Sequence, residues 1–202
     1  MEGTNARPRI MVVDGHDDER RTTTRMLRVR GATVFEASTI EGALSESIDG
    51  VDGWIVDHKL PNGRGTNLLH ILRTEGSAAP ALLVTNDGSI SLAGLAAAFG
   101  ATFHGKPLLP EVVDALIHDA ERAIPVGRRL NADLRLTERE REVVAQRADG
   151  ICRAGIAGAL NITEDAVKSR VRGILKKANM AGYACDTLDD LLLDAHRRRD
   201  AS

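Results

Sequence analysis

The sequence predicts a small doubly wound α/β domain with a five-stranded parallel sheet, followed by a small all-α domain. Two observations predict this. Between residues 9 and 122, short apolar runs alternate with longer stretches of helical periodicity. After residue 135 no strand-like run remains, and helical spacing dominates. Strands that alternate with helices favour a parallel sheet covered on both faces.

The predicted strands are short runs of three or four residues, rich in β-branched or aromatic types. They cover residues 10–13, 33–35, 54–56, 81–84 and 101–103. Helical stretches lie between them, as the spacing of Leu68, Leu69, Ile71 and Leu72 indicates. Together they predict a domain over residues 9–122.

The pattern changes at the Ile124-Pro125 step. Residues 123–135 show no periodic apolar face, so we expect a polar linker there. Residues 136–198 have helical spacing, with breaks at Asp149-Gly150 and at residues 161–163. This stretch predicts a separate helical domain.

Composition narrows the class of protein. With 43% hydrophobic and 28% charged residues and a net charge of -2, the chain resembles a soluble globular protein. The total charge does not indicate nucleic-acid binding, so charge has to be read locally. No apolar stretch is long enough to span a bilayer, and residues 1–9 lack the apolar core of a signal peptide. We expect a cytoplasmic protein with no membrane partner, and Cys152 and Cys185 as buried thiols.

Four polar residues follow four of the predicted strands: Asp14, Asp57, Thr85 and Lys106. In an open parallel sheet, chemistry collects at the carboxyl ends of the strands, so these side chains are expected to meet. A carboxylate can act as nucleophile, a divalent cation offsets charge, and a hydroxyl and an ammonium hold phosphoryl oxygens. This set can accept a phosphoryl group.

Two longer stretches carry a family resemblance. The segment DHKLPNGRG at residues 57–65 and the segment GATFHGKP at residues 100–107 resemble the motifs of receiver domains of two-component systems, which have a flavodoxin-like fold. The resemblance covers residues 9 to about 122. It implies that Asp57 is the phosphoacceptor, Thr85 the switch hydroxyl, Lys106 the phosphoryl clamp and Phe103 the switch aromatic residue.

The sequence departs from the receiver pattern after the first strand. Receivers generally carry two adjacent acids there, and the resemblance implies a Mg²⁺ site that includes Asp14 and Asp57. Gly15 replaces the second acid, which in the family touches the metal directly, so we expect a weakened site. Asp17 and Asp18 begin the first helix and are expected to interact with its positive end. Two interpretations stay open: phosphorylation of Asp57, with a sensor histidine kinase as partner, or a pseudo-receiver that responds to a protein partner or small ligand.

The helical domain begins with a capping box, in which Thr137 precedes Glu140 by three residues. A second helix follows Gly150, and a turn at residues 161–163 leads to a third helix capped by Thr163. On a helical wheel, the apolar residues of the third helix fall within an arc of about 100°. Its polar residues form another face, comprising Lys168, Ser169, Arg172 and Lys176, flanked by Arg170 and Lys177.

This domain resembles the LuxR/FixJ/NarL type of helix-turn-helix. The matching stretches are LTEREREVV at residues 136–144, LNIT at 160–163 and VKSRV at 167–171. The resemblance places the helix-turn-helix at residues 153–172 and implies binding to double-stranded DNA, with Lys168, Ser169 and Arg172 facing the groove. The other expected DNA-binding residues are Thr163, Arg170, Lys176 and Lys177.

In this family the last helix, here around residues 188–195, also forms a dimer contact, so we expect a homodimer on a two-fold DNA site. Two departures reduce the expected local stability. Gly155 stands where the family usually has Glu, and Ala178 where it usually has Leu.

An enzyme of doubly wound fold is the alternative from another class. A phosphatase that used Asp57 as nucleophile would need an acid two residues later, where Lys59 stands. The chain has neither a glycine-rich phosphate loop after its first strand nor the Gly-x-Ser-x-Gly elbow of a hydrolase. The sequence therefore favours a DNA-binding transcriptional response regulator whose receiver domain controls dimerisation and DNA binding, and not an enzyme.

Overall fold

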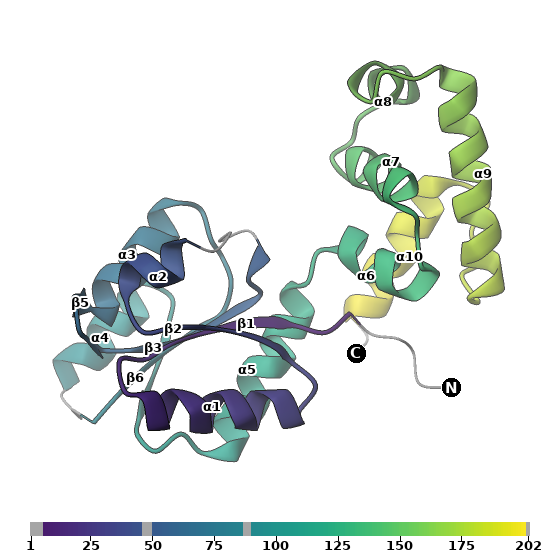
Figure 1. The fold of residues 1–202 in the computed structure, drawn as a ribbon. Helices are drawn as coiled ribbons and strands as arrows, with labels where there is room; N and C mark the ends of the chain where they lie inside the picture. The colour runs from purple at the N-terminus through teal and green to yellow at the C-terminus, as the bar shows by residue number, and fades with distance from the viewer. Residues whose placement is uncertain (1–5, 46–49, 87–89, 201–202) are drawn as a thin grey trace. The chain divides into compact units, whose positions relative to one another are not determined.

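The computed structural model describes residues 6–45, 50–86 and 90–200. The chain divides into two compact units, one from Arg7 to Ala123 and another that begins at Ile124 (Figure 1). Each unit has its own buried apolar core. No helix in these described ranges is long and apolar enough to cross a membrane.

The first unit contains the predicted five-stranded parallel sheet, and the predicted fold class is confirmed. Its strand order is β2-β1-β3-β6-β7. The strands are β1 (Arg9–Val13), β2 (Thr33–Ala37), β3 (Gly53–Asp57), β6 (Ala81–Thr85) and β7 (Thr102–Gly105). Each contains most of a predicted run, and the ends differ by one or two residues. A two-residue hairpin, β4 (Lys59–Leu60) with β5 (Gly63–Arg64), was not predicted.

Helices cover both faces of this sheet (Figure 1). The helices are α1 (Asp17–Val29), α2 (Ile40–Leu44), α3 (Gly65–Thr74), α4 (Ile90–Ala98) and α5 (Pro110–Ala123). Successive residues of a strand point to opposite faces. Ile10 and Val12 therefore pack under α1 and α5, while Met11 and Val13 pack under the other three helices.

The second unit is wholly helical, as predicted. Its helices are α6 (Val126–Leu134), α7 (Glu138–Ala148), α8 (Arg153–Ala159), α9 (Glu164–Met180) and α10 (Leu188–Asp200). The predicted capping box is confirmed, because Thr137 and Glu140 bond reciprocally to each other's backbone N–H groups. Thr163 also caps α9, since its side chain accepts a hydrogen bond from Ala166 N at 3.2 Å.

The expectation of a polar linker at residues 123–135 is wrong. Val126, Leu130 and Leu134 recur every four residues, form one face of α6 and lie buried in the core of the second unit. Apolar residues four positions apart lie on one face of a helix, but the charged residues between them make this pattern hard to recognise in the sequence. The helix ends at Arg135, which has a φ of 46°.

The expectation for the cysteines is half correct, since Cys185 is buried but Cys152 is exposed.

Candidate functional site

The carboxyl edge of the sheet gathers the four predicted polar residues. Asp14 follows β1, Asp57 and Thr85 end β3 and β6, and Lys106 follows β7. The strand register pairs Asp57 with Val84 and Thr85 with Gly105, so these strand ends lie level with one another. Asp14, Asp57 and Thr85 are buried, with 4%, 3% and 1% of their surface exposed. We call Asp14, Asp57, Thr85 and Lys106 the acidic pocket.

Lys106 links the two aspartates of the acidic pocket. Its Nζ lies 2.8 Å from Asp14 Oδ2 and 3.2 Å from Asp57 Oδ1. Nζ also donates a hydrogen bond to Glu19 on α1, a residue that the sequence analysis missed. Nothing in the periodicity of α1 distinguishes Glu19 from an ordinary exposed acid. The ammonium is therefore surrounded by three carboxylates.

Burial and charge act in opposite directions in this pocket. Burial alone would lower the pKa of Lys106, but its hydrogen bonds to Asp14 and Glu19 and the nearby negative charges raise that pKa above its ordinary value. Burial raises the pKa of the Asp57 carboxyl, and the charge of Lys106 offsets this only in part. The charge of Asp14 raises the pKa of Asp57 further. Lys106 therefore stays cationic, while the charged form of Asp57 is disfavoured.

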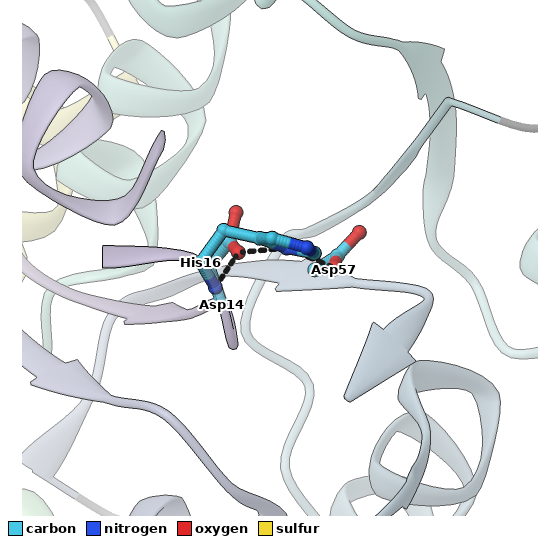
Figure 2. A group of neighbouring side chains, drawn as sticks. All are labelled: Asp14, His16 and Asp57. Atoms are coloured by element: carbon cyan, nitrogen blue, oxygen red, sulfur yellow. Dashed lines mark hydrogen bonds and ion pairs between the residues drawn. The ribbon is translucent and has the colours of Figure 1, made fainter. Parts of the chain in front are cut away.

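His16 is a second residue that the sequence analysis missed. Its Nδ1 lies 3.5 Å from Asp14 Oδ1 and 4.0 Å from Asp57 Oδ2, and Figure 2 shows the imidazole between the two carboxylates. Its backbone N donates a hydrogen bond to Asp14 Oδ1 at 2.8 Å. The side chain is 64% exposed, so it stands at the mouth of the pocket. Its position immediately after Gly15 was the only sequence signal that could have found it.

Gly15 lies where a side chain has no room. A Cβ at this position would lie 2.7 Å from Pro61 Cδ, closer than real Cβ atoms approach, and 3.0 Å from Pro61 Cγ. Because the proline ring is rigid, a carboxylate at residue 15 would require the loop after β4 to move. Asp17, which is nearby in sequence, forms an ion pair with Arg20 on the exposed side of α1. It does not replace the missing acid.

Three side chains at the carboxyl edge of the sheet carry atoms that could ligate a metal ion. Donor atoms of Asp14, His16 and Asp57 all lie within 4.8 Å of one another. Among residues 6–45, 50–86 and 90–200, this is the one group of three or more such side chains. It offers two carboxylates and one imidazole, whereas the sequence analysis expected carboxylates alone.

Phe103, the predicted switch aromatic residue, lies on β7 and not among the polar side chains of the pocket. It is half-buried and packs against the core beneath α2, α3 and α4. The strand that carries Phe103 therefore leads to Lys106, but the Phe103 side chain packs in the apolar core and not in the acidic pocket.

The second candidate site is the outer surface of α9. Val167, Ile174 and Ala178 are buried in the core of the second unit. Lys168, Ser169, Arg172 and Lys176 are exposed, and we call them the basic face. Among the residues that the structure describes, no acid lies within 4.0 Å of the three cations of this face. Cations that have no acid nearby in the described part of the chain are available to an external anion.

Three predicted DNA-binding residues, on α9 or at its N-terminus, are not part of the basic face. Lys177 is not free, because its Nζ lies 2.5 Å from Glu140 Oε2 within the same unit. Arg170 is half-buried, and its Nη1 is enclosed with no hydrogen-bond partner among the described residues. The Thr163 hydroxyl is engaged as the cap of α9. The structure therefore brings together four of the seven predicted residues.

The two units match different family descriptions. Residues 10–117 match the response regulator receiver domain, and residues 134–184 match the bacterial regulatory proteins of the luxR family. The nitrate/nitrite response regulator protein NarP of Escherichia coli (strain K12) is 28% identical over 199 residues. That alignment covers 89% of this chain and 92% of NarP.

Solved structures resemble the first unit. A CheY-like response regulator receiver domain protein from Methanospirillum hungatei JF-1 has a TM-score of 0.53 at 23% identity, covering 58% of this chain and 96% of its own. Chemotaxis protein CheY4 of Vibrio cholerae has a TM-score of 0.51 at 25% identity, covering 55% of this chain and 97% of its own. The receiver match, the luxR-family match and the relative that spans both units all agree. The chain therefore belongs to the NarL/FixJ family of response regulators, transcription regulators in which a receiver domain precedes a LuxR-type helix-turn-helix domain.

Proposed function

We propose that the receiver domain of this regulator controls homodimerisation and DNA binding through phosphorylation of Asp57. One observation carries the proposal: Lys106 Nζ lies within 3.2 Å of both Asp14 and Asp57. A phosphoryl group on Asp57 would therefore form beside an ammonium that is already in place. Thr85, at the end of the adjacent strand, supplies a hydroxyl for a phosphoryl oxygen.

The proposed step is a phosphoryl transfer. A carboxylate oxygen of Asp57 attacks the phosphorus of a donor, the bond between phosphorus and the donor atom breaks, and the donor leaves with the electron pair. The product is an acyl phosphate that carries roughly -1.5 to -2 charges. Lys106 offsets part of this charge. A sensor histidine kinase is the donor that a receiver domain implies.

The metal that receiver domains typically use is Mg²⁺, and the pocket is a poor match for it. Mg²⁺ requires near-octahedral oxygen ligands. Asp14 and Asp57 supply carboxylate oxygens, but residue 15 supplies none, and Pro61 fills the space beside it. An imidazole nitrogen of His16 is the third donor within reach. These donors do not form the all-oxygen ligand set that Mg²⁺ prefers.

Phosphorylation is proposed to change the conformation of the surface formed by α4, β7 and α5. Movement of Thr85 towards the phosphoryl group would free space on the neighbouring strand, and Phe103, half-buried on β7, would rotate inward. Such a change biases a two-state surface towards a dimer. The helix α10 offers a further dimer contact, since Leu193 is 52% exposed while Leu188, Leu191 and Leu192 are buried.

The basic face of α9 is proposed to enter the major groove of DNA. An α-helix fits this groove, where Arg and Lys hydrogen-bond to guanine acceptors and other cations contact phosphates. Lys168, Ser169 and Arg172 are exposed on one side of α9, opposite its buried valine and isoleucine. A dimer would present two such helices to a two-fold site.

The test has two readouts on the full chain. The protein is incubated with a small acyl phosphate and a divalent ion, and its mass is measured. DNA duplexes are selected from a random library, and their affinity is compared with and without the donor. We expect a phosphoryl adduct and tighter DNA binding in the wild type, neither in Asp57→Asn, and both in Asp52→Asn, a buried aspartate outside the pocket.

A second candidate function is a phosphorylation-independent regulator whose receiver domain responds to a protein partner or small ligand. The position of Pro61 favours it, because the proline ring occupies the space that a side chain at residue 15 would need. Selection of a specific duplex, without an adduct on Asp57 under conditions that label an ordinary receiver domain, would support this alternative and contradict phosphorylation.

A further inference from the structure

We propose that Asp14, His16 and Asp57 bind a divalent transition-metal ion of the zinc class in preference to Mg²⁺. This inference deepens the proposed function by naming the cation of the acidic pocket. Its test uses neither a phosphodonor nor DNA, so the two proposals can fail separately.

The first observation is how the carboxylate oxygens are divided. Lys106 contacts Asp14 through Oδ2 and Asp57 through Oδ1. His16 faces the other oxygen of each carboxylate, Oδ1 of Asp14 and Oδ2 of Asp57. One oxygen of each aspartate therefore remains on the imidazole side (Figure 2). An ion held there would leave both contacts of the ammonium in place.

The second observation is the spacing of the donors. Two donors bound to one ion at about 2.1 Å each stand at most about 4.2 Å apart. His16 Nδ1 lies 3.5 Å from one carboxylate oxygen and 4.0 Å from the other. Both distances fit a single shared ion, and because all three donor atoms lie within 4.8 Å of one another, a small movement of one carboxylate would complete the set. The hydrogen bond from His16 N to Asp14 Oδ1 orients that carboxylate towards the imidazole.

The third observation is charge. Three carboxylates, those of Asp14, Glu19 and Asp57, surround the one ammonium of Lys106. Asp14 and Asp57 have side chains that are only 6% and 4% exposed, so water screens them weakly. A buried excess of negative charge is costly unless a cation pairs with it. A divalent ion would remove that excess.

Donor chemistry selects the ion. Imidazole suits Zn²⁺, Ni²⁺ and Cu²⁺, whereas Mg²⁺ prefers oxygen ligands alone. With three protein donors and an exposed histidine, the site is open, and water would fill the remaining positions. Such an open site differs from a closed structural zinc site, and it leaves room for a phosphoryl oxygen beside Asp57.

The experiment is a calorimetric titration of the full chain with Zn²⁺ alone and with Mg²⁺ alone. Co²⁺ added separately reports the ligand set through its visible absorption spectrum. We expect Zn²⁺ to bind at least about tenfold more tightly than Mg²⁺, and His16→Ala to lose at least about tenfold in zinc affinity, since even an outer-shell partner contributes that much. The matched control is His118→Ala, which removes an exposed histidine from α5 of the same unit and should not change the affinity.

A substitution that changes selectivity excludes a merely structural role for His16. His16→Asp replaces the nitrogen donor with a carboxylate and is expected to shift preference towards Mg²⁺. The His16 side chain makes no capping hydrogen bond to α1, so both variants should fold, as circular dichroism without metal would verify. Wild-type protein that binds Mg²⁺ as tightly as Zn²⁺ overturns the proposal. So does a zinc affinity that falls less than tenfold in His16→Ala.

Discussion

The two units carry their candidate functional residues in opposite ways. In the receiver domain Asp14, Asp57 and Thr85 are buried, and Lys106 contacts both aspartates. In the DNA-binding domain the basic face of α9 is exposed, and its cations have no acidic partner among the described residues. A substitution in the pocket therefore changes stability together with chemistry. A substitution on the basic face can change binding alone.

Not every cation near the basic face is available to a ligand. Lys177, one residue after Lys176, is held by Glu140, which also completes the capping box of α7. A cation in such a pair contributes to the fold of its own domain. Position on the helix, and not charge alone, thus separates a residue available to a ligand from a residue used for folding.

The largest expected effect is on DNA affinity. We expect Lys168→Ala and Arg172→Ala each to cost about 1–3 kcal/mol for a lost base contact. Unfolding free energies should stay within about 0.5 kcal/mol of wild type, because both side chains are exposed. Fluorescence anisotropy with the selected duplex measures the first quantity, and denaturant unfolding the second.

Lys177→Ala is the contrasting variant in this measurement. Because Lys177 pairs with Glu140, its removal should lower the stability of the domain while DNA affinity changes little. Equal losses of affinity in Lys177→Ala and Lys168→Ala would break the distinction between the basic face and its flank. Unchanged affinity in both Lys168→Ala and Arg172→Ala would mean that α9 is not the recognition helix.

The next effect tests how tightly the pocket is built. Gly15→Ala should destabilise the receiver domain by about 1–3 kcal/mol, since the new methyl group meets Pro61. Gly15→Ala with Pro61→Ala should recover part of that loss, because residues in contact are not additive. The fluorescence of Trp54, the single tryptophan, buried in β3, reports unfolding of this unit.

Gly94→Ala, on α4 with nothing within 4 Å of its Cβ position, is the matched control. It should be neutral or slightly stabilising, because alanine reduces the freedom of the unfolded chain. If the Gly15 and Pro61 substitutions were additive within about 0.5 kcal/mol, the steric explanation of Gly15 would be wrong.

The fold was largely predictable because each strand of the five-stranded sheet contains a short run of apolar or β-branched residues, with longer helical stretches between the runs. The helix α6 was not, although Val126, Leu130 and Leu134 mark its buried face. Their four-residue spacing extends over only two turns and lies among arginines, so a local reading found no periodicity. Burial against the rest of the second unit, a tertiary effect, stabilises this helix.

The pocket residues at strand ends were predictable from topology, because parallel strands end at one edge. His16 and Glu19 were not, since they lie in the loop before α1 and on its first turn, where sequence patterns give no direction to a side chain. Departures from a family pattern were visible, but their causes were not. Gly15 faces Pro61, and a Cβ on Gly155 would meet Ile151 Cγ2 at 2.7 Å. Only coordinates show that these neighbours occupy the space of a side chain.

The smallest expected effect concerns the charge of Asp57. Its pKa is raised, chiefly by burial, so in the folded state it keeps its proton to a higher pH than in the unfolded state. Stability therefore falls as pH rises from the ordinary carboxyl value of 3.8 through the raised pKa. Asp57→Asn removes this cost, and the variant should be more stable than wild type at neutral pH.

Urea unfolding followed through Trp54 at several pH values measures this difference. The advantage of Asp57→Asn should disappear as the pH falls below the ordinary carboxyl range, where both proteins are neutral at residue 57. Asp52→Asn gives the contrast, because the buried Asp52 carboxylate accepts a hydrogen bond from Arg9 N at 2.7 Å, and a neutral amide oxygen in its place should weaken that bond and lower stability slightly. A variant Asp57→Asn less stable than wild type at pH 7 would show that Lys106 more than offsets the burial of Asp57. In that case the ion pair with Lys106 would stabilise the Asp57 carboxylate at least as well as water does, as water stabilises the exposed cations of the basic face.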